Sequence, residues 1–338
     1  MKSKAVPALS VLDLSPVRKG FTAADALQDT LKLAKFVDQL GYKRYWLAEH
    51  HDMGGIACTS PEIIIPHVAN VTSNIRVGSG GIMLPNHSAL KVAENFRTLE
   101  AFHPGRIDLG LGRAPGTNGR TAIALRGKGE RLSADNFPEQ VADLTSFLTD
   151  NFADDHPYKN IHALPGGVGL PELWILGSSD WGATFAGQAG FPYSFAQHFS
   201  PAAARDILKV YRQHFEPSPL LEKPRAMVCV RAICADTDTE AQDLAMSGEY
   251  TFFRLRQTGK SEPLPSVEEI KSMGLIKDDW LQIKSYSMAN FVGSQETLRS
   301  QITKFAEDCQ LDELMVLTMV YDQKARQHSY KLLADLFI

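Results

Sequence analysis

The chain has 338 residues, 44% of them hydrophobic, and its 35 Lys and Arg against 39 Asp and Glu give a formal net charge of −4. This length and apolar fraction suffice for a large domain with its own core. A chain with this slightly negative net charge has no excess of basic residues to attract nucleic acid or an anionic membrane, so we expect neither among its partners.

The four cysteines form no C-x-x-C pair, so the sequence signals neither a zinc site nor a disulfide framework. No apolar segment follows the charged N-terminal residues, and no apolar run approaches membrane-spanning length. These features predict a reduced, cytoplasmic protein.

Apolar runs alternate with segments of helical periodicity, which predicts βαβ units around a parallel sheet. Eight such units favour a closed (β/α)8 TIM barrel, formed by residues 1–338 as a single domain, over an open doubly wound sheet. The expected strands are residues 9–14, 44–49, 75–84, 106–112, 172–176, 193–197, 225–235 and 311–320.

Capping residues indicate where several helices begin. Thr22 and Asp25 form a capping-box pattern, Gly41 suits the end of that helix, and Ser60-Pro61 suits the start of the next. Further helices are expected over residues 89–102, 133–148 and 180–189, after Ser200-Pro201, and up to Leu336.

Residues 250–291 do not fit this alternation. The segment contains Gly259, Pro263, Pro265 and Gly274 among short helical pieces, and it is too long for a plain βα connection. We therefore predict a lid-like insertion after strand seven, lying over the mouth of the barrel.

Residues 45–52 form an apolar run that ends in ionisable groups, Tyr-Trp-Leu-Ala-Glu-His-His-Asp. Strand alternation places Glu49 and His51 on one face and His50 on the other. Adjacent histidines cannot both face a barrel interior, which argues against a two-histidine metal site. They are either rim residues without chemistry or, because barrel enzymes keep catalytic groups at the carboxyl ends of strands, part of an active site.

Two further stretches carry glycines at the ends of predicted strands. Residues 75–85 contain three glycines, which indicates a bulge, an unusual peptide or a closely approaching ligand. Residues 109–116 fail the dinucleotide-binding fingerprint, because Gly116 comes one residue late and Pro115 stands where the helix should begin. Arg113, at the end of that strand, would suit either a phosphate or a neighbouring carboxylate.

Residues 176–183 pass from a strand through Ser178 and Ser179 into a helix. Free N–H groups, the helix dipole and two hydroxyls suit a bound phosphate. Ordinary N-capping by either serine explains the pattern equally well.

Together these stretches resemble the bacterial luciferase-like, flavin-dependent monooxygenase family, in order and over nearly the whole chain. Residues 46–51 are similar to its second-strand motif, whose first histidine is catalytic, which implies this role for His50. Residues 77–85 resemble its third strand, where a non-prolyl cis peptide lies against the flavin, implied here at Gly80–Gly81.

The same resemblance extends to the cofactor phosphate. Residues 105–113 resemble the segment whose last arginine, here Arg113, binds the FMN phosphate, and Arg131 matches a second phosphate arginine by spacing. Gly177-Ser178-Ser179 resembles the loop around the phosphate and ring, and residues 291–296 resemble a turn near the family's C-terminus. This phosphate site would follow strands four and five, whereas barrels in general place it after strands seven and eight.

The resemblance implies that reduced FMN, as co-substrate, reacts with O₂ to oxygenate a small organic substrate. His50 would act as the acid–base group, because an ordinary histidine pKa of about 6.5 lies near the working pH. The resemblance implies a separate flavin reductase as a partner. We also expect a homodimer, and we expect no bound metal. Two alternatives stay open: a deazaflavin-dependent barrel oxidoreductase and a non-catalytic flavin-binding protein. Gly112 stands where luciferase has a cysteine, so light emission is not implied.

Overall fold

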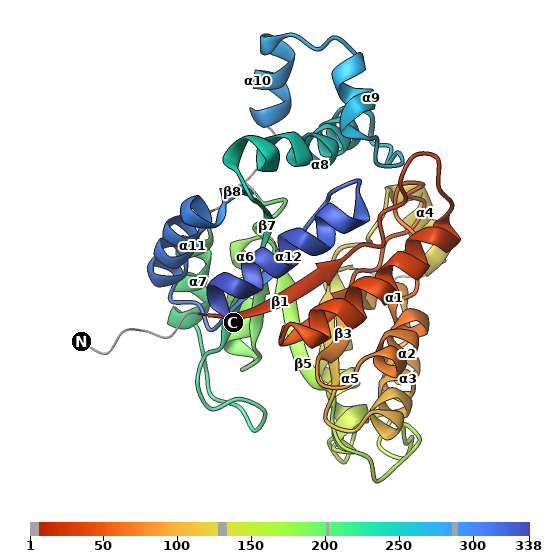
Figure 1. Cartoon of the computed structure of the whole chain (residues 1–338). Helices are drawn as coiled ribbons and strands as arrows, with labels where there is room; N and C mark the ends of the chain where they lie inside the picture. The colour runs from red at the N-terminus through yellow and green to blue at the C-terminus, as the bar shows by residue number, and fades with distance from the viewer. Residues whose placement is uncertain (1–6, 128–133, 201–202, 286–289) are drawn as a thin grey trace, which may run out of the picture.

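The computed structural model of the chain describes residues 7–127, 134–200, 203–285 and 290–338 (Figure 1). Strands β1 to β6 neighbour one another in chain order, β9 lies between β7 and β1, and pairing of β6 with β7 closes a ring of eight parallel strands. This confirms the predicted (β/α)8 TIM barrel. The strands of the ring are β1 (Ala8–Asp13), β2 (Arg44–Leu47), β3 (Arg76–Met83), β4 (Ile107–Gly112), β5 (Glu172–Gly177), β6 (Tyr193–Phe195), β7 (Ala226–Ala235) and β9 (Glu313–Leu317).

A ninth strand, β8 (Asn290–Ser294), lies outside this ring and was not predicted. It pairs with residues 231–235 of β7, whereas β9 pairs with residues 227–231. β7 has ten residues and β9 only five, so the second half of β7 extends beyond the ring and offers an edge to β8. The expected turn at 291–296 is therefore wrong: these residues complete β8 and cap α11 through Ser294, whose side chain accepts a hydrogen bond from Thr297 N.

The helices begin and end largely where the capping residues predict. The Thr22–Asp25 capping box opens α1, and Gly41 follows its end with a φ of +86°. Asn118 caps an additional short helix, α4, that was not expected. No helix in the described part of the chain is both long and apolar enough to span a membrane. The helices outside the insertion are α1 (Ala23–Gln39), α2 (Pro61–Val71), α3 (Ala89–Phe102), α4 (Gly119–Arg126), α5 (Phe137–Thr149), α6 (Asp180–Gln188), α7 (Ala204–Gln213), α11 (Gln295–Cys309) and α12 (Gln323–Phe337), with short 3₁₀ turns at Leu84–Asn86 and Ala134–Asn136.

Alternate strand residues face either the surrounding helices or the barrel interior. On β2, Tyr45 and Leu47 belong to the outer core between strands and helices, whereas Trp46 belongs to a separate cluster inside the barrel. Trp46 meets Trp174 edge to face there, with ring centroids 5.7 Å apart. The interior is a packed core rather than a pore, and its other buried members are Leu12, Ala48, Met227, Cys229, Met315 and Leu317.

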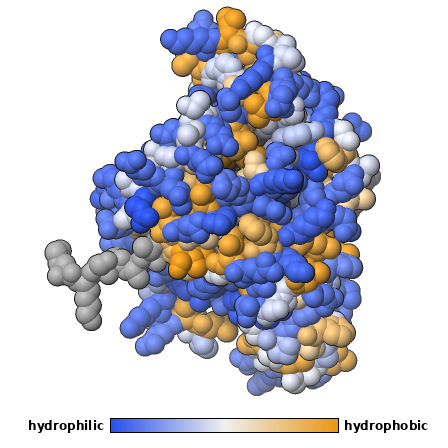
Figure 2. Space-filling view, viewed as in Figure 1, coloured by the Kyte–Doolittle hydropathy of each residue, from blue (hydrophilic) through white to orange (hydrophobic). Residues whose placement is uncertain are grey.

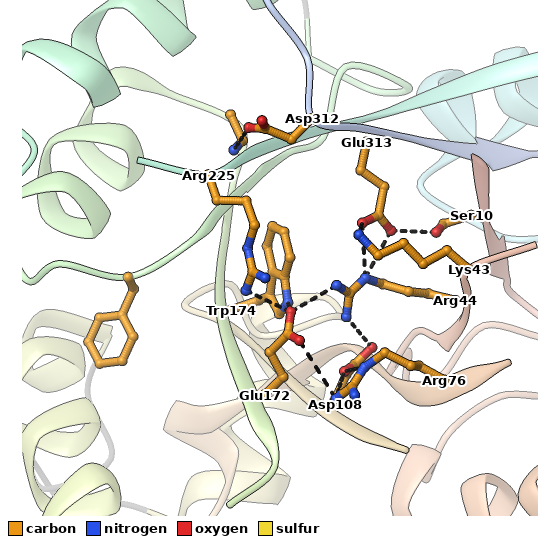
Figure 3. Close-up of polar contacts among 12 residues, drawn as sticks. Ser10, Lys43, Arg44, Arg76, Asp108, Glu172, Trp174, Arg225, Asp312 and Glu313 are labelled. Atoms are coloured by element: carbon orange, nitrogen blue, oxygen red, sulfur yellow. Dashed lines mark hydrogen bonds and ion pairs between the residues drawn. The ribbon is translucent and has the colours of Figure 1, made fainter. Parts of the chain in front are cut away.

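A network of ion pairs closes the amino-terminal end of the barrel (Figure 3). The buried Arg44 lies at its centre: Nε is 2.9 Å from Glu313 Oε1, Nη1 is 2.8 Å from Asp108 Oδ2, and Nη2 is 2.8 Å from Glu172 Oε1. Burial alone would lower the pKa of Arg44, but these three carboxylates raise it above its usual value. Each of these three carboxylates also has a second cationic partner: Lys43 for Glu313, Arg76 for Asp108 and Arg225 for Glu172.

The insertion lies at the opposite end of the barrel, at the top of Figure 1. It comprises α8 (Asp238–Thr258), α9 (Val267–Ser272) and α10 (Lys277–Ser285). The predicted start at residue 250 falls inside α8, which runs unbroken from its Thr237 cap to the left-handed Gly259. In Figure 2 hydrophilic side chains predominate, and apolar side chains gather across the middle of the face. On the insertion, Met273, Ile276 and Leu281 are exposed.

Candidate active site

The carboxyl ends of β2, β3, β4 and β5 are neighbours in the ring. Four of the predicted site segments follow or end these strands, so the structure brings His50, Gly80–Gly81, Arg113 and Ser178–Ser179 to one arc of the barrel mouth. Arg131, the second predicted phosphate arginine, lies outside the described residues.

Glu49 anchors the loop that carries His50. Its carboxylate accepts hydrogen bonds from Met83 N at 2.8 Å and Asn86 Nδ2 at 3.1 Å, and it lies 2.7 Å from His51 Nε2 and 2.9 Å from His87 Nε2. Burial alone would raise the pKa of Glu49, but the bonds to His87 and His51 lower it below its usual value. Glu49 and His51 thus share one side of the chain, as alternation predicts, and His51 serves to hold the loop.

His50 has different surroundings from His51. Its backbone N–H donates to Cys58 O at 3.2 Å, and its buried Nδ1 has no hydrogen-bond partner among the described residues. Burial lowers the pKa of His50 to about 4, although the charge of Glu49 opposes the shift. The expectation of an ordinary pKa near the working pH is therefore wrong, because desolvation disfavours the charged ring. His50 is a neutral imidazole at pH 7.

The strand-three glycines pack closely against their neighbours. The Gly80–Gly81 peptide bond is cis, as the resemblance implies. A Cβ on Gly80 would lie 3.0 Å from Trp46 and Leu12 side-chain atoms, and one on Gly81 would lie 2.7 Å from a backbone oxygen of β4. A register shift between β3 and β4 falls at the same point. Packing and a bulge already account for both glycines, and their contact with a flavin stays a prediction.

Arg113 and the loop after β5 meet at the ends of adjacent strands. The Arg113 guanidinium lies 3.8 Å from the ring centroid of Trp181, in the first turn of α6, and none of the described carboxylates pairs with it. Ser179 is the N-cap of α6, yet its side chain makes no capping hydrogen bond, so ordinary side-chain capping does not explain this serine. A cation, an available hydroxyl and a helix N-terminus together suit a phosphate.

Two residues that the sequence analysis did not select complete the mouth. His198 follows β6, and Arg231 lies on β7 in phase with the inward-facing Met227 and Cys229. Burial, the charge of Arg231 and a smaller effect of His50 lower the pKa of His198 to about 3. The available signal was Arg231 itself, the one charged residue in the apolar run of residues 226–235.

The insertion reaches several loops of the mouth. On α8, Arg256 Nη2 donates to Phe199 O, after β6, at 3.1 Å. Farther along, Gly55 N, in the loop after β2, donates to Ser261 O at 3.1 Å. The backbone of Leu264 then makes two bonds of 2.8 and 2.9 Å to the loop after β1. The insertion thus contacts loops on opposite sides of the ring and spans the mouth.

The sequence profile of the luciferase-like monooxygenase family matches residues 8–308. The chain belongs to this family. A luciferase-like monooxygenase of Escherichia coli (strain K12) is 40% identical over 331 residues, covering 97% of this chain and 96% of that protein. The N-acetyl-S-alkylcysteine monooxygenase of Bacillus subtilis (strain 168) is 32% identical over 328 residues, covering 97% of both.

Solved structures of this family and fold are similar along the whole chain. The crystal structure of apo-MsnO8 has a TM-score of 0.90 and 38% identity over 98% of both chains. Two more distant structures share the fold alone: the FMN complex of the oxygenating constituent of 3,6-diketocamphane monooxygenase from Pseudomonas putida (TM-score 0.74, 21% identity) and an F420-dependent secondary alcohol dehydrogenase (TM-score 0.66, 13% identity), each over 98% of both chains. Because these two bind different cofactors, the fold does not identify the cofactor of this chain.

Proposed function

We propose that this chain is a monooxygenase that uses reduced FMN and O₂ to oxygenate a small organic substrate. The observation that supports it is that Arg113 and Ser179, which suit a phosphate, share one arc of the barrel mouth with His50, a neutral histidine whose Nδ1 is buried. Reduced FMN would supply the electrons for oxygen activation, and the protein would bind, orient and shield it.

The residues present fit the phosphate of FMN. Arg113 has no paired carboxylate in the described part of the chain, and Ser179 has a hydroxyl that caps nothing. Hydrogen bonds to charged groups contribute about 1.5–3 kcal/mol each, so this pair would favour FMN over riboflavin. Ser178 would contribute beside Ser179, and Arg131 would add a second cation.

His50 would take the acid–base role from its neutral state. The unpartnered Nδ1 is available to accept a proton or to hold a hydrogen bond at the reacting atoms. Since its pKa is about 4, His50 would be uncharged before a reaction cycle and would therefore begin as a base. Glu49 and His51 would hold its loop in place without taking part in the proton transfer.

The insertion would act as a lid. It spans the mouth through contacts to three loops, and a closed mouth would exclude water from the reacting groups. A separate flavin reductase, a homodimer and a cytoplasmic location remain predictions of the resemblance.

The test is an anaerobic titration of the protein with reduced FMN and, separately, reduced coenzyme F420, followed by rapid mixing with O₂. We expect binding of FMN and a reoxidation rate that differs from that of free reduced FMN. Binding of F420 without FMN would support the deazaflavin-dependent alternative. Binding of FMN with an unchanged reoxidation rate would support a non-catalytic flavin-binding protein.

A further inference from the structure

Asn86 has a buried side chain that bonds to three other segments of the chain at once. It ends the 3₁₀ turn after β3 and is 8% exposed. Its Nδ2 donates to Glu49 Oε1 at 3.1 Å and to Pro115 O at 3.0 Å, and its Oδ1 accepts from Arg126 Nε at 2.9 Å. Two acceptors on one side of the amide and a donor on the other define the way in which it faces.

The segments that Asn86 joins are those that carry the proposed site residues. Glu49 directly precedes His50 in the loop after β2. Pro115 lies two residues after Arg113 in the loop after β4. Since β3 stands between these two strands in the ring, the amide of Asn86 lies between the loop of the candidate acid–base group and the loop of the candidate phosphate-binding arginine.

The same two loops make a second contact, on the other side of His50. His51 N donates to Gly116 O at 3.1 Å, and Thr117 Oγ1 donates to His51 O at 2.7 Å. His50 therefore lies between two contacts, that of Asn86 before it and those of His51 after it. With only the second contact left, the loop could pivot about residue 51.

Loss of the Asn86 amide would act on the two loops more than on the charge of Glu49. The Glu49 carboxylate keeps Met83 N, His51 and His87 as partners without Asn86. Pro115 O, in contrast, accepts a hydrogen bond from no other described residue. The bond to Pro115 is thus the part of this contact that nothing else replaces.

We propose that Asn86 is a positioning residue, which holds His50 and Arg113 in one relative placement through its two donated hydrogen bonds. In the proposed function, on which this inference rests, one of these residues acts at the reacting atoms and the other at the flavin phosphate. Two groups that act on different parts of one bound molecule must keep their spacing, because a misplacement of about 1 Å can reduce a rate about 10²-fold.

The first test is hydrogen exchange of the His51 amide in the flavin-free protein at pH 8, because this amide bonds to Gly116 O across the two loops. Asn86→Ala should accelerate its exchange at least tenfold and leave the amides of β1 and β9 unchanged. Asn86→Asp keeps the size of the side chain and the acceptor for Arg126, but its carboxylate donates nothing, so it should show the same acceleration. Asn95→Ala is the matched control: Asn95 is a half-buried asparagine on α3 without a described hydrogen bond to either loop, and exchange should stay as in wild type.

The second test measures the affinities of FMN and riboflavin and the rate at which bound reduced FMN reacts with O₂. Asn86→Ala should weaken FMN binding at least fivefold and riboflavin binding less than twofold. Added to Arg113→Ala, it should weaken FMN binding less than twofold further, because a residue that acts through Arg113 has no effect once that arginine is absent. Added to His50→Ala, it should leave the reoxidation rate within twofold for the same reason.

Wild-type exchange at His51 in Asn86→Ala would overturn the proposal, as would an equal acceleration in the barrel strands or wild-type behaviour of Asn86→Asp. Full additivity with either Arg113→Ala or His50→Ala would assign Asn86 an independent structural role and also overturn it. If wild type binds no FMN, the proposed function fails, while the exchange of the His51 amide still decides whether Asn86 holds the two loops together. The two failures are therefore distinguishable.

Discussion

Two arginines inside the same barrel have opposite surroundings. Arg44, at the amino-terminal end, bonds to carboxylates from three strands, and these raise its pKa. Arg231, at the mouth, has two buried nitrogens without an acceptor among the described residues, and burial lowers its pKa to about 10. The same residue type is satisfied at one end and left available at the other.

The difference separates the part of the barrel that maintains the fold from the part that binds ligands. A buried polar group contributes to a stable fold only when its hydrogen bonds are made. The closed end meets this condition for Arg44, whereas at the mouth His50, His198 and Arg231 have buried nitrogens without a partner in the described part of the chain. Such groups lower stability unless a ligand completes them, which is common at active sites.

The largest expected effect is at the mouth, in His50→Ala. Loss of a general acid–base group should cut turnover by ~10²–10⁴-fold while FMN affinity changes only a few-fold. His51→Ala is the control: it should reduce turnover less and stability more, because His51 is bound to the buried Glu49. Steady-state kinetics and FMN titration check both variants, and a fully active His50→Ala enzyme would refute the role.

Arg44→Met should destabilise the amino-terminal end of the barrel. Removing this cation leaves Asp108 and Glu313 buried with fewer partners, which should lower the free energy of unfolding by about 3–5 kcal/mol. Arg231→Met should change the free energy of unfolding by less than about 1 kcal/mol, because two of the buried Arg231 nitrogens have no acceptor among the described residues. Urea denaturation measures both changes. Equal losses would mean that the two ends do not differ as described.

The neutral histidines of the mouth should make stability depend on pH. The pKa of His50 falls from 6.5 to about 4 and that of His198 to about 3, so both contribute stability above pH 6.5 that is lost as the pH decreases toward those values. Each histidine should lower the free energy of unfolding by about 2 kcal/mol as the pH decreases from 6.5 to 5. The raised pKa of His87 acts in the opposite direction.

Urea denaturation at pH 7.5 and 5.0 isolates these two residues when wild type is compared with His50→Gln and His198→Gln. Each variant should reduce the difference between the two pH values. A pH dependence identical to wild type in both variants would contradict the burial of neutral rings.

The smallest expected effect is in the insertion. Hydrogen exchange over residues 259–285 should slow when flavin and substrate bind, because the lid would then stay closed over the mouth. In the free protein the same amides should exchange faster than those of β1 and β9. Protection equal to that of the barrel strands without ligand would argue against a lid.

Much of the fold could be predicted from short-range patterns in the sequence. Thr22, Asp25 and Gly41 define the ends of α1 through short-range hydrogen bonds and backbone conformation, which a sequence displays directly. β8 was missed because it exists only where the second half of β7 extends past β9, a consequence of tertiary pairing. The start of the insertion was misplaced because α8 continues through residue 250.

The residues of the candidate site also fall into those that the sequence predicts and those that only the tertiary structure brings together. His50, Arg113 and Ser179 lie in motifs that a family resemblance locates, and the structure brings their strand ends together. His198 and Arg231 are 33 positions apart and come to neighbouring strands only because β6 pairs with β7. The low pKa of His50 was equally hidden, since it depends on burial by residues distant in the sequence.

The most direct test of an FMN site at this mouth compares the affinities of FMN and riboflavin for wild type and Arg113→Ala, because the two flavins differ only in the phosphate. Loss of a charge-assisted interaction of about 1.5–3 kcal/mol should weaken FMN binding roughly 10- to 100-fold and leave riboflavin binding unchanged. Equal losses for both flavins, or no loss for FMN, would contradict the account.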